Sequence, residues 1–260
     1  MTAAILWSPW SFVAVFFLIS SLGLVEFYNL MKSDQTEPQV LSGLLIGQSL
    51  LLLLTYLLWN HLGLDWMVVS IPMMAIVFIA ELFRKKNHPF QNIAITLLGI
   101  LYLTVPIALM IKIAFGFTPG DNDPYHGEVI MGCIFLVWAS DTGAYLIGSR
   151  IGKHRMFERI SPKKSWEGFL GGMATALLAG WLLSKIFMDL NLIEWMILSI
   201  IIVITGTLGD LVESMLKRSI GVKDSGTILP GHGGILDRFD ALLISMPFVF
   251  YYLFLAGKFV

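Results

Sequence analysis

The chain has 260 residues, of which 57% are hydrophobic and 13% charged, and its formal net charge is −1. Soluble domains are usually about a quarter charged, so this composition, with a mean hydropathy of +0.79, excludes an ordinary soluble fold and indicates lipid as the solvent. A net charge near zero gives no reason to expect a nucleic-acid partner, and a single cysteine, Cys133, excludes a disulfide framework and a cysteine-based zinc site.

Eight apolar segments are long enough to cross a bilayer, which takes about 20 residues in a helix. In chain order they are residues 11–31, 40–59, 65–83, 91–115, 128–149, 166–187, 192–217 and 241–257. The first has no basic region before it, so we interpret it as a span rather than a removable signal peptide. The fourth and seventh are long, which leaves three alternatives for each: a tilt, a break or an extra short helix that would make nine elements. Pro106 is a candidate kink. Because backbone groups in lipid must be hydrogen-bonded within the segment, the predicted fold is all-α: a polytopic integral membrane helical bundle with eight to nine membrane helices.

The basic residues indicate the orientation. Fourteen of the 17 Lys and Arg residues lie in one set of alternate loops and the adjoining helix ends: Lys32, Arg84, Lys85, Lys86, Arg150, Lys153, Arg155, Arg159, Lys163, Lys164, Lys217, Arg218, Lys223 and Arg238. Cytoplasmic loops carry such an excess, so this side is predicted to be cytoplasmic, and eight spans would place both termini on the other side. We expect a multi-pass protein of the plasma (inner) membrane with its active site facing the cytoplasm.

The polar residues concentrate in the second half of the chain. Residues 1–130 are predicted to form N-terminal membrane helices without recognisable chemistry. Residues 131–260 are predicted to form catalytic membrane helices with cytoplasmic loops at 150–165 and 218–240, in a single membrane-embedded unit with the first half. Glu26 and Glu81 lie near cytoplasmic helix ends, where we expect snorkelling or pairing rather than catalysis.

Ionisable groups inside a membrane span are costly and are therefore candidates for function, and three acidic residues of the predicted spans are interpreted in this way. They are Asp141 in the fifth span and Asp210 and Glu213 in the seventh. Asp141 precedes Arg150 by about 13 Å of helix, and Asp210 precedes Arg218 by about 12 Å. This similar depth predicts one water-filled cavity that opens to the cytoplasm.

Four polar residues share one face of the seventh helix, because they are spaced at i, i+3, i+4 and i+7: Asp210, Glu213, Ser214 and Lys217. Carboxylates, a hydroxyl and an ammonium in one stripe suit a cation together with an anionic ligand. The alternative is an internal ion pair between Glu213 and Lys217 with a purely structural role. Asp210 has no comparable local partner.

The loop at 218–240 combines glycines with charged residues. Glycines at 226, 231, 233 and 234 permit close approach of the backbone to a ligand, and successive N–H groups in such a loop can cradle phosphate oxygens. Asp237 and Asp240 are three residues apart at the start of the last span and so share one face, which also suits simple complementarity with a helix N-terminus. Carboxylates interleaved with Lys and Arg are typical of Mg²⁺-nucleotide chemistry. His232 is a candidate general base, phosphate donor or loop hydrogen-bond partner.

The segment SPKKSWEG (161–168) precedes the sixth span. Ser165 is placed to cap that helix. Lys163 and Lys164, just before a helix start, suit the phosphate of a lipid headgroup or of a nucleotide. The alternative is ordinary anchoring by positive residues on the cytoplasmic side.

The segments SMLKR (214–218), KDSG (223–226) and LPGHGGILDRFD (229–240) together resemble the signature of the phosphatidate cytidylyltransferase (CDP-diacylglycerol synthase) family. SPKKSWEG (161–168) and ASDTGAY (139–145) are similar to further segments of that family. The resemblance is strong over residues 135–245 and only architectural before them. It implies the reaction of CTP with phosphatidic acid from the bilayer to give CDP-diacylglycerol and pyrophosphate. It also implies a Mg²⁺-dependent homodimer, with a second cation such as K⁺ as a further family expectation.

The resemblance implies that Asp210 and Asp237 bind the metal. We expect Asp240, Asp224 and Asp141 to be further ligands or supporting groups. The predicted catalytic residues are Asp210, Asp237, Asp224, Lys217 and Asp141. Lys217, Arg218, Lys223 and Arg238 are expected to contact the CTP phosphates, and Lys163 and Lys164 to hold the lipid headgroup. The other predicted substrate-binding residues are Ser165, Ser214, His232, Gly233 and Gly234.

Two other functions fit part of the pattern. A transferase that moves a phosphosugar onto a polyprenyl phosphate would also use Mg²⁺ and cytoplasmic aspartates. Adjacent aspartate pairs would favour it, and the chain has none. An ion-coupled transporter would use Asp141, Asp210 and Glu213 as ion sites, although transporters tend to show paired, interrupted helices in two related halves.

Overall fold

We describe the protein from a computed structural model that places residues 2–116, 125–226 and 233–259. The elements are α1 (Thr2–Trp7), α2 (Pro9–Met31), α3 (Val40–Trp59), η1 (Leu64–Val69), α4 (Ser70–Arg84), α5 (Pro89–Gly99), η2 (Ile100–Thr104), α6 (Val105–Gly116), α7 (Gly127–Ile151), β1 (Arg155–Phe157), β2 (Ser161–Ser165), α8 (Trp166–Ile186), α9 (Leu192–Ser219) and α10 (Leu236–Leu255). The described ranges hold eight helices that are long and apolar enough to cross a membrane. They confirm the eight predicted segments, except that the last begins at Leu236 rather than at residue 241.

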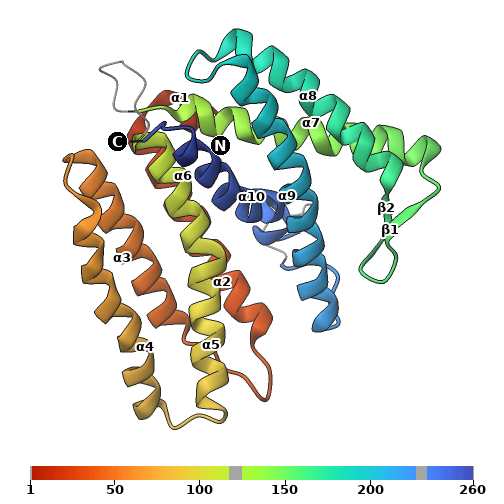
Figure 1. The fold of residues 1–260 in the computed structure, drawn as a ribbon. Helices are drawn as coiled ribbons and strands as arrows, with labels where there is room; N and C mark the ends of the chain where they lie inside the picture. Colours follow the sequence, from red (N-terminus) through yellow and green to blue (C-terminus); the bar gives the residue numbers. More distant parts are fainter. Residues whose placement is uncertain (1, 117–124, 227–232, 260) are drawn as a thin grey trace.

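The first half is a bundle in which α2, α3, α4 and the continuous rod of α5, η2 and α6 run side by side (Figure 1). Buried polar groups join these helices at one end. Glu81 of α4 accepts hydrogen bonds from Gln39 Nε2 and Asn92 Nδ2, both at 2.7 Å. Its other contact is an ion pair of 2.7 Å with Arg84. The prediction that Glu81 is paired is therefore confirmed.

Pro106 follows a widened π-helical turn, η2, and does not break its helix. Proline lacks an N–H and its ring clashes with the carbonyl of the residue four positions earlier, so a local π turn relieves the conflict. The segment Pro89–Gly116 therefore remains one 28-residue span, and the ninth membrane element is not found in the described part of the chain.

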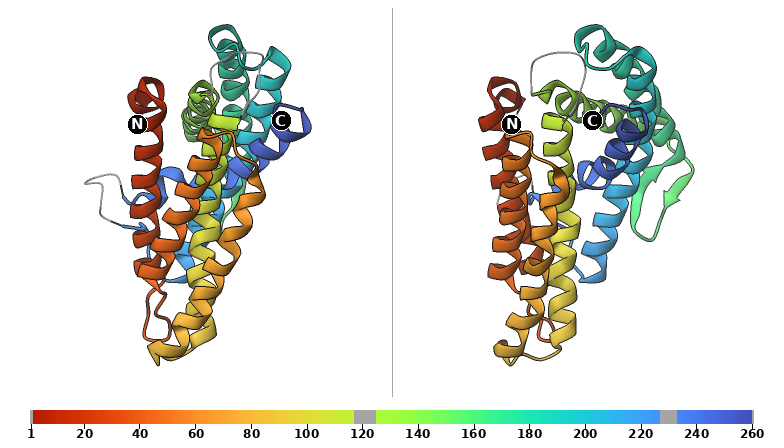
Figure 2. Two further views of the ribbon diagram at one scale, coloured as in Figure 1. Left: turned by 90° about the vertical axis from the view of Figure 1, so that its left-hand side faces the viewer. Right: turned by 60° about the vertical axis from the view of Figure 1, so that its left-hand side comes forward.

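Helices α7 and α8 pack against each other along small residues. A Cβ at Gly172 of α8 would lie 2.8 Å from the carbonyl oxygen of Ser140 on α7, so only glycine permits this approach. Thr175 adds a hydrogen bond of 2.8 Å to the carbonyl oxygen of Ala139. The left view of Figure 2 shows α7 almost end-on, so α7, which carries Asp141, crosses the first-half bundle at a steep angle.

The segment between α7 and α8 departs from the all-α prediction, because β1 and β2 form a short antiparallel hairpin there. Glu167, in the first turn of α8, fixes its base by accepting hydrogen bonds from the backbone N–H groups of Lys153 and His154. Ser165 caps α8, as predicted, by accepting from Gly168 N at 3.1 Å. The hairpin is thus held against the start of α8.

The basic helix ends lie together. The C-terminal ends of α2, α4 and α9 are at the lower end of the molecule in Figure 1, whereas both termini lie near the opposite end (Figure 2). This agrees with the even number of spans. One hydrophobic core contains residues of both halves, so the first half supports the helices that carry the polar residues.

Candidate active site

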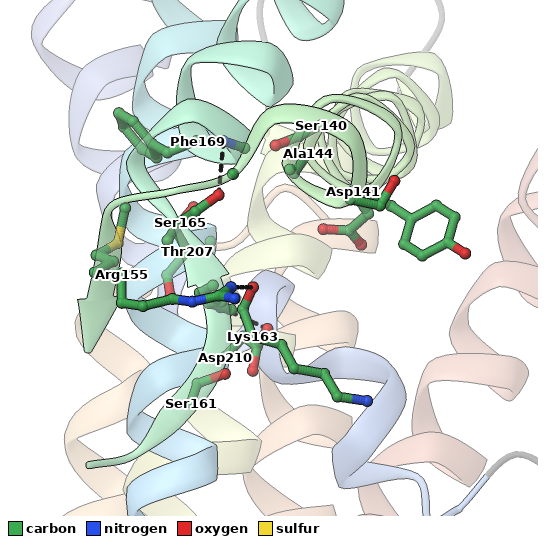
Figure 3. A pocket seen from close by; sticks show the side chains of 18 residues that line it. Ser140, Asp141, Ala144, Arg155, Ser161, Lys163, Ser165, Phe169, Thr207 and Asp210 are labelled. Atoms are coloured by element: carbon green, nitrogen blue, oxygen red, sulfur yellow. Dashed lines mark hydrogen bonds and ion pairs between the residues drawn. The ribbon is translucent and has the colours of Figure 1, made fainter. Parts of the chain in front are cut away.

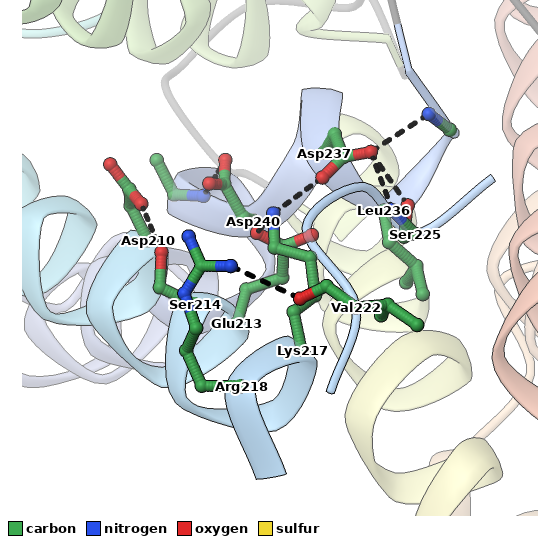
Figure 4. Close-up of polar contacts among 12 residues, drawn as sticks. Asp210, Glu213, Ser214, Lys217, Arg218, Val222, Ser225, Leu236, Asp237 and Asp240 are labelled. Atoms are coloured by element: carbon green, nitrogen blue, oxygen red, sulfur yellow. Dashed lines mark hydrogen bonds and ion pairs between the residues drawn. The ribbon is translucent and has the colours of Figure 1, made fainter. Parts of the chain in front are cut away.

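Three carboxylates meet where α9 crosses α10. Single oxygens of Asp210, Glu213 and Asp240 all lie within 4.8 Å of one another (Figure 4). Asp210 and Glu213 are three residues apart and so share a helix face. Asp240 reaches them because Gly209 lets the helices approach: a Cβ there would lie 2.6 Å from the carbonyl oxygen of Asp240.

Glu213 is the buried member of this cluster, with 1% of its side chain exposed. Its Oε2 forms an ion pair of 2.7 Å with Lys217, as the structural alternative predicted. Its Oε1 has no hydrogen-bond partner among the described residues. A buried carboxylate oxygen without a donor is costly, so this oxygen is suited to accept a cation or proton from outside.

Lys217 does more than pair within its own helix. Its Nζ also lies 2.5 Å from Oδ1 of Asp237, so one ammonium bridges α9 and α10 (Figure 4). Oδ2 of Asp237 accepts from Ser225 N at 3.0 Å and Gly234 N at 2.8 Å. Asp237 is therefore beside the three-carboxylate cluster but is already surrounded by donors.

Asp210 has a partner from a distant segment. Lys164 of β2 places its Nζ 2.6 Å from Oδ2 of Asp210 and 3.3 Å from the carbonyl oxygen of Thr207. Ser214 donates a further hydrogen bond of 3.2 Å to Oδ1 of Asp210. The hairpin thus brings a predicted headgroup lysine to a predicted metal ligand.

A pocket of about 600 Å³ lies between α7, the hairpin, the start of α8 and α9. Asp141 and Asp210 both line it (Figure 3), which confirms the prediction that they share one cavity. Lys163, Lys164 and Ser165 line it as well. Cationic, carboxylate and hydroxyl groups thus face one space.

The remaining predicted residues lie around the loop after α9. Lys223 and Asp224 are exposed, and Asp224 forms no ion pair or hydrogen bond with another described residue. Arg218 donates to the carbonyl oxygen of Val222 at 3.1 Å, and Arg238 is exposed in the first turn of α10. Gly233 has a φ of +79° and sits against Asp237. His232 lies outside the described residues.

Two residues of the site region were not predicted from the sequence. Arg155 of β1 lines the pocket because the hairpin register pairs it with Ser165, and only a predicted hairpin could have revealed this. Glu26 of α2 is buried against the loop after α9, with Ser225 Oγ 2.5 Å from its Oε1. It is an ionisable residue inside a span, which is the signal that selected Asp141 and Asp210.

Comparison with known proteins decides the family. The model of the cytidylyltransferase family matches residues 1–256. The chain belongs to the cytidylyltransferase family. Phosphatidate cytidylyltransferase of Bacillus subtilis is 32% identical over 243 residues, which are 93% of this chain and 88% of the relative. The enzyme of the same name from Staphylococcus aureus strain COL is 36% identical over 87% of this chain and 84% of the relative.

A third relative has a higher identity over a shorter aligned stretch. Phosphatidate cytidylyltransferase of Haemophilus influenzae is 45% identical over 139 residues, which are 51% of this chain and 48% of that protein. The resemblance stated from residues 135–245 is confirmed at the level of the family. The match to the cytidylyltransferase model also includes the first half, where the sequence motifs alone showed only similar architecture.

Proposed function

We propose that the chain transfers the cytidylyl group of CTP to phosphatidic acid and so makes CDP-diacylglycerol and pyrophosphate. The observation that carries the proposal is the pairing of Lys164 with Asp210 between the pocket and the three-carboxylate cluster. It places a phosphate-binding cation beside oxygens suited to a metal, in a cytidylyltransferase whose relatives are named for phosphatidate.

The chemistry needs charge neutralisation more than an activated nucleophile. An oxygen of the lipid phosphate forms a bond to the α-phosphorus of CTP, while the bond from that phosphorus to the bridging oxygen of the β-phosphate breaks. The electron pair leaves with pyrophosphate, so atoms and charge balance without a general base. Both reactants are anions, and ammonium and guanidinium groups reduce their repulsion and stabilise the charge that develops.

The donor set fits Mg²⁺, because hard carboxylate oxygens converge and Oε1 of Glu213 lacks a donor among the described residues. Asp210, Glu213 and Asp240 would hold the ion. When bound, it would neutralise phosphate charge and polarise the α-phosphate. Metal binding by Asp237 and Asp224 stays a prediction. A second cation such as K⁺ also stays a prediction. The ammonium of Lys217 already lies between the carboxylates of Glu213 and Asp237.

We assign the two substrates to different parts of the site. Lys163, Lys164 and Ser165 face the pocket and suit the phosphatidate headgroup. Arg218, Lys223 and Arg238 belong to the loop after α9 and the start of α10, and suit the CTP phosphates. The pocket is also lined by Tyr145 and Phe169 of the membrane helices α7 and α8, which supports entry of the lipid from the side.

The basic ends of α2, α4 and α9 lie together, which supports a site facing the cytoplasm in the plasma (inner) membrane. CTP and pyrophosphate would then exchange with the cytosol. A homodimer stays an expectation from the family resemblance.

The reaction is tested by incubating the purified protein with CTP, Mg²⁺ and one of three lipids: phosphatidic acid, diacylglycerol or a polyprenyl phosphate. We expect CDP-diacylglycerol and equimolar pyrophosphate with phosphatidic acid only, since diacylglycerol lacks the attacking phosphate. Turnover with the polyprenyl phosphate alone would reject the substrate. Ion flux in proteoliposomes without CTP consumption would instead support a transporter.

Replacing Lys163 with alanine is expected to raise the KM for phosphatidic acid about tenfold and to leave the KM for CTP unchanged, since a charge-assisted hydrogen bond contributes about 1.5–3 kcal/mol. Steady-state kinetics in mixed micelles measure both constants. Arg159→Ala is the matched control, because Arg159 is an exposed basic residue of the same segment that does not line the pocket. A rise in the KM for CTP alone would show that Lys163 binds the nucleotide.

A further inference from the structure

Glu26 links the first half of the chain to the loop after α9. It lies on α2 and is only 4% exposed. Its Oε1 accepts from Ser225 Oγ at 2.5 Å and Leu236 N at 3.0 Å, and its Oε2 accepts from Ile235 N at 2.8 Å. No ion pair to Glu26 occurs among the described residues, so these three donors are what the structure shows stabilising the buried carboxylate.

These contacts replace an ordinary helix cap. The first N–H groups of a helix have no partner within it and usually bond to a side chain at the N-cap position. The N-cap residue of α10 is Ile235, whose side chain cannot accept a hydrogen bond. Glu26, 209 positions earlier in the chain, accepts from Ile235 N instead, and from Leu236 N as well. The negative carboxylate also complements the positive end of the helix dipole.

The loop is shaped to receive this carboxylate. A Cβ at Gly234 would collide with Oε1 of Glu26 and with Ser225 Oγ, and a Cβ at Gly226 would lie 3.0 Å from Oε2 of Glu26. The sequence suggested that these glycines make room for a ligand. In the structure, the space at Gly234 and Gly226 is filled by Glu26.

A short chain of contacts connects Glu26 to the carboxylate cluster. Ser225 contacts both Glu26 and Asp237, with Ser225 Oγ 2.8 Å from Oδ2 of Asp237. Asp237 in turn pairs with Lys217, which pairs with Glu213. The serine hydroxyl has one proton and donates to one carboxylate at a time, while the Ser225 N–H keeps its own bond to Asp237. Displacing Glu26 therefore alters what holds Asp237 and Lys217.

We propose that Glu26 is a positioning residue for the cytidylyl transfer: it fixes Ser225 and the start of α10, and through them the placement of Asp237 and Lys217. The proposal rests on the proposed function of the site. It gives the first half of the chain a part in the reaction although Glu26 touches neither substrate.

The test compares the purified full-length Glu26→Gln protein with wild type and with Glu81→Gln. Glu81 is an equally buried glutamate of the first half, with hydrogen bonds from Gln39 and Asn92, and it forms no hydrogen bond or ion pair with the described residues of the loop after α9. Two kinds of measurement are made: amide hydrogen exchange at residues 225 and 234–236, and steady-state kinetics that give kcat and both KM values. Glutamine keeps the size of glutamate but turns one acceptor into a donor, which faces N–H groups here.

In Glu26→Gln we expect exchange at residues 235 and 236 to rise at least tenfold and kcat to fall about 10- to 100-fold, with the KM for phosphatidic acid unchanged. Glu81→Gln should show neither change at those residues.

Wild-type exchange in Glu26→Gln, or faster exchange with a wild-type kcat, would overturn the proposal. A uniform loss of protection in both variants would also overturn it, because it would show a general effect on stability. If wild type makes no CDP-lipid, the proposed function fails, whereas the exchange data still show whether Glu26 holds the loop.

Discussion

Replacing Asp210 with asparagine is expected to lower kcat about 10²- to 10³-fold, the usual loss when one positioned electrostatic partner is removed from an active site. Asp210 contacts Lys164 and shares the carboxylate cluster with Glu213 and Asp240. Asparagine keeps the size of the side chain and removes its charge. The Mg²⁺ concentration that gives half-maximal activity should therefore rise as well, as measured in a Mg²⁺ titration of initial rates.

Glu194→Gln is the matched control for that experiment. Glu194 lies on the same helix, at its other end, and forms an ion pair of 2.7 Å with Lys258. We expect its kcat and its Mg²⁺ dependence to match wild type. Near-normal turnover of Asp210→Asn in saturating Mg²⁺ would reject Asp210 as a metal ligand.

Replacing Lys217 with methionine is expected to lower the free energy of unfolding by about 3–5 kcal/mol, because it leaves two carboxylates without their shared cation in a buried site. The side chains of Lys217, Glu213 and Asp237 are 11%, 1% and 14% exposed, so solvent replaces little of the lost interaction. Denaturant unfolding in detergent measures the change. Activity should be lost as well, since Lys217 orders both carboxylates.

Two further variants separate charge from packing at this position. Lys112→Met removes a half-buried lysine that lies over the ring of Phe259, 5.5 Å from its centroid, and should cost no more than about 1 kcal/mol. Adding Glu213→Gln and Asp237→Asn to Lys217→Met should restore most of the stability and none of the activity. If Lys217→Met unfolds like wild type, the bridge between α9 and α10 does not stabilise the fold.

The membrane spans could be predicted because their signal is local and strong. About 20 apolar residues in sequence are required at each crossing, and positive residues accumulate on one side. The depth argument for Asp141 and Asp210 needed only the rise per residue of a helix, and the structure places both at one pocket. The hairpin at 155–165 was missed because it is short, most of its residues are polar and it lies between the predicted spans.

Partners between segments could not be predicted, since they depend on how the helices cross. Nothing in the sequence joins Lys164 to Asp210, 46 positions away, or Glu26 to Leu236, 210 positions away. Glu213 and Lys217 were visible as a pair because they are four residues apart. The second contact of Lys217, with Asp237, appears only when α10 is in place. The functional residues that were missed are those positioned by tertiary contacts rather than by a motif.

The most direct test of the account follows the phosphorus atoms of CTP. Purified protein is given phosphatidic acid and Mg²⁺ with CTP labelled at either the α- or the γ-phosphate. If the lipid phosphate attacks the α-phosphorus, the α-label appears in the lipid and the γ-label appears in pyrophosphate in equal amount. Transfer of the γ-label to the lipid, or release of both labels into water-soluble products, would contradict cytidylyl transfer at this site.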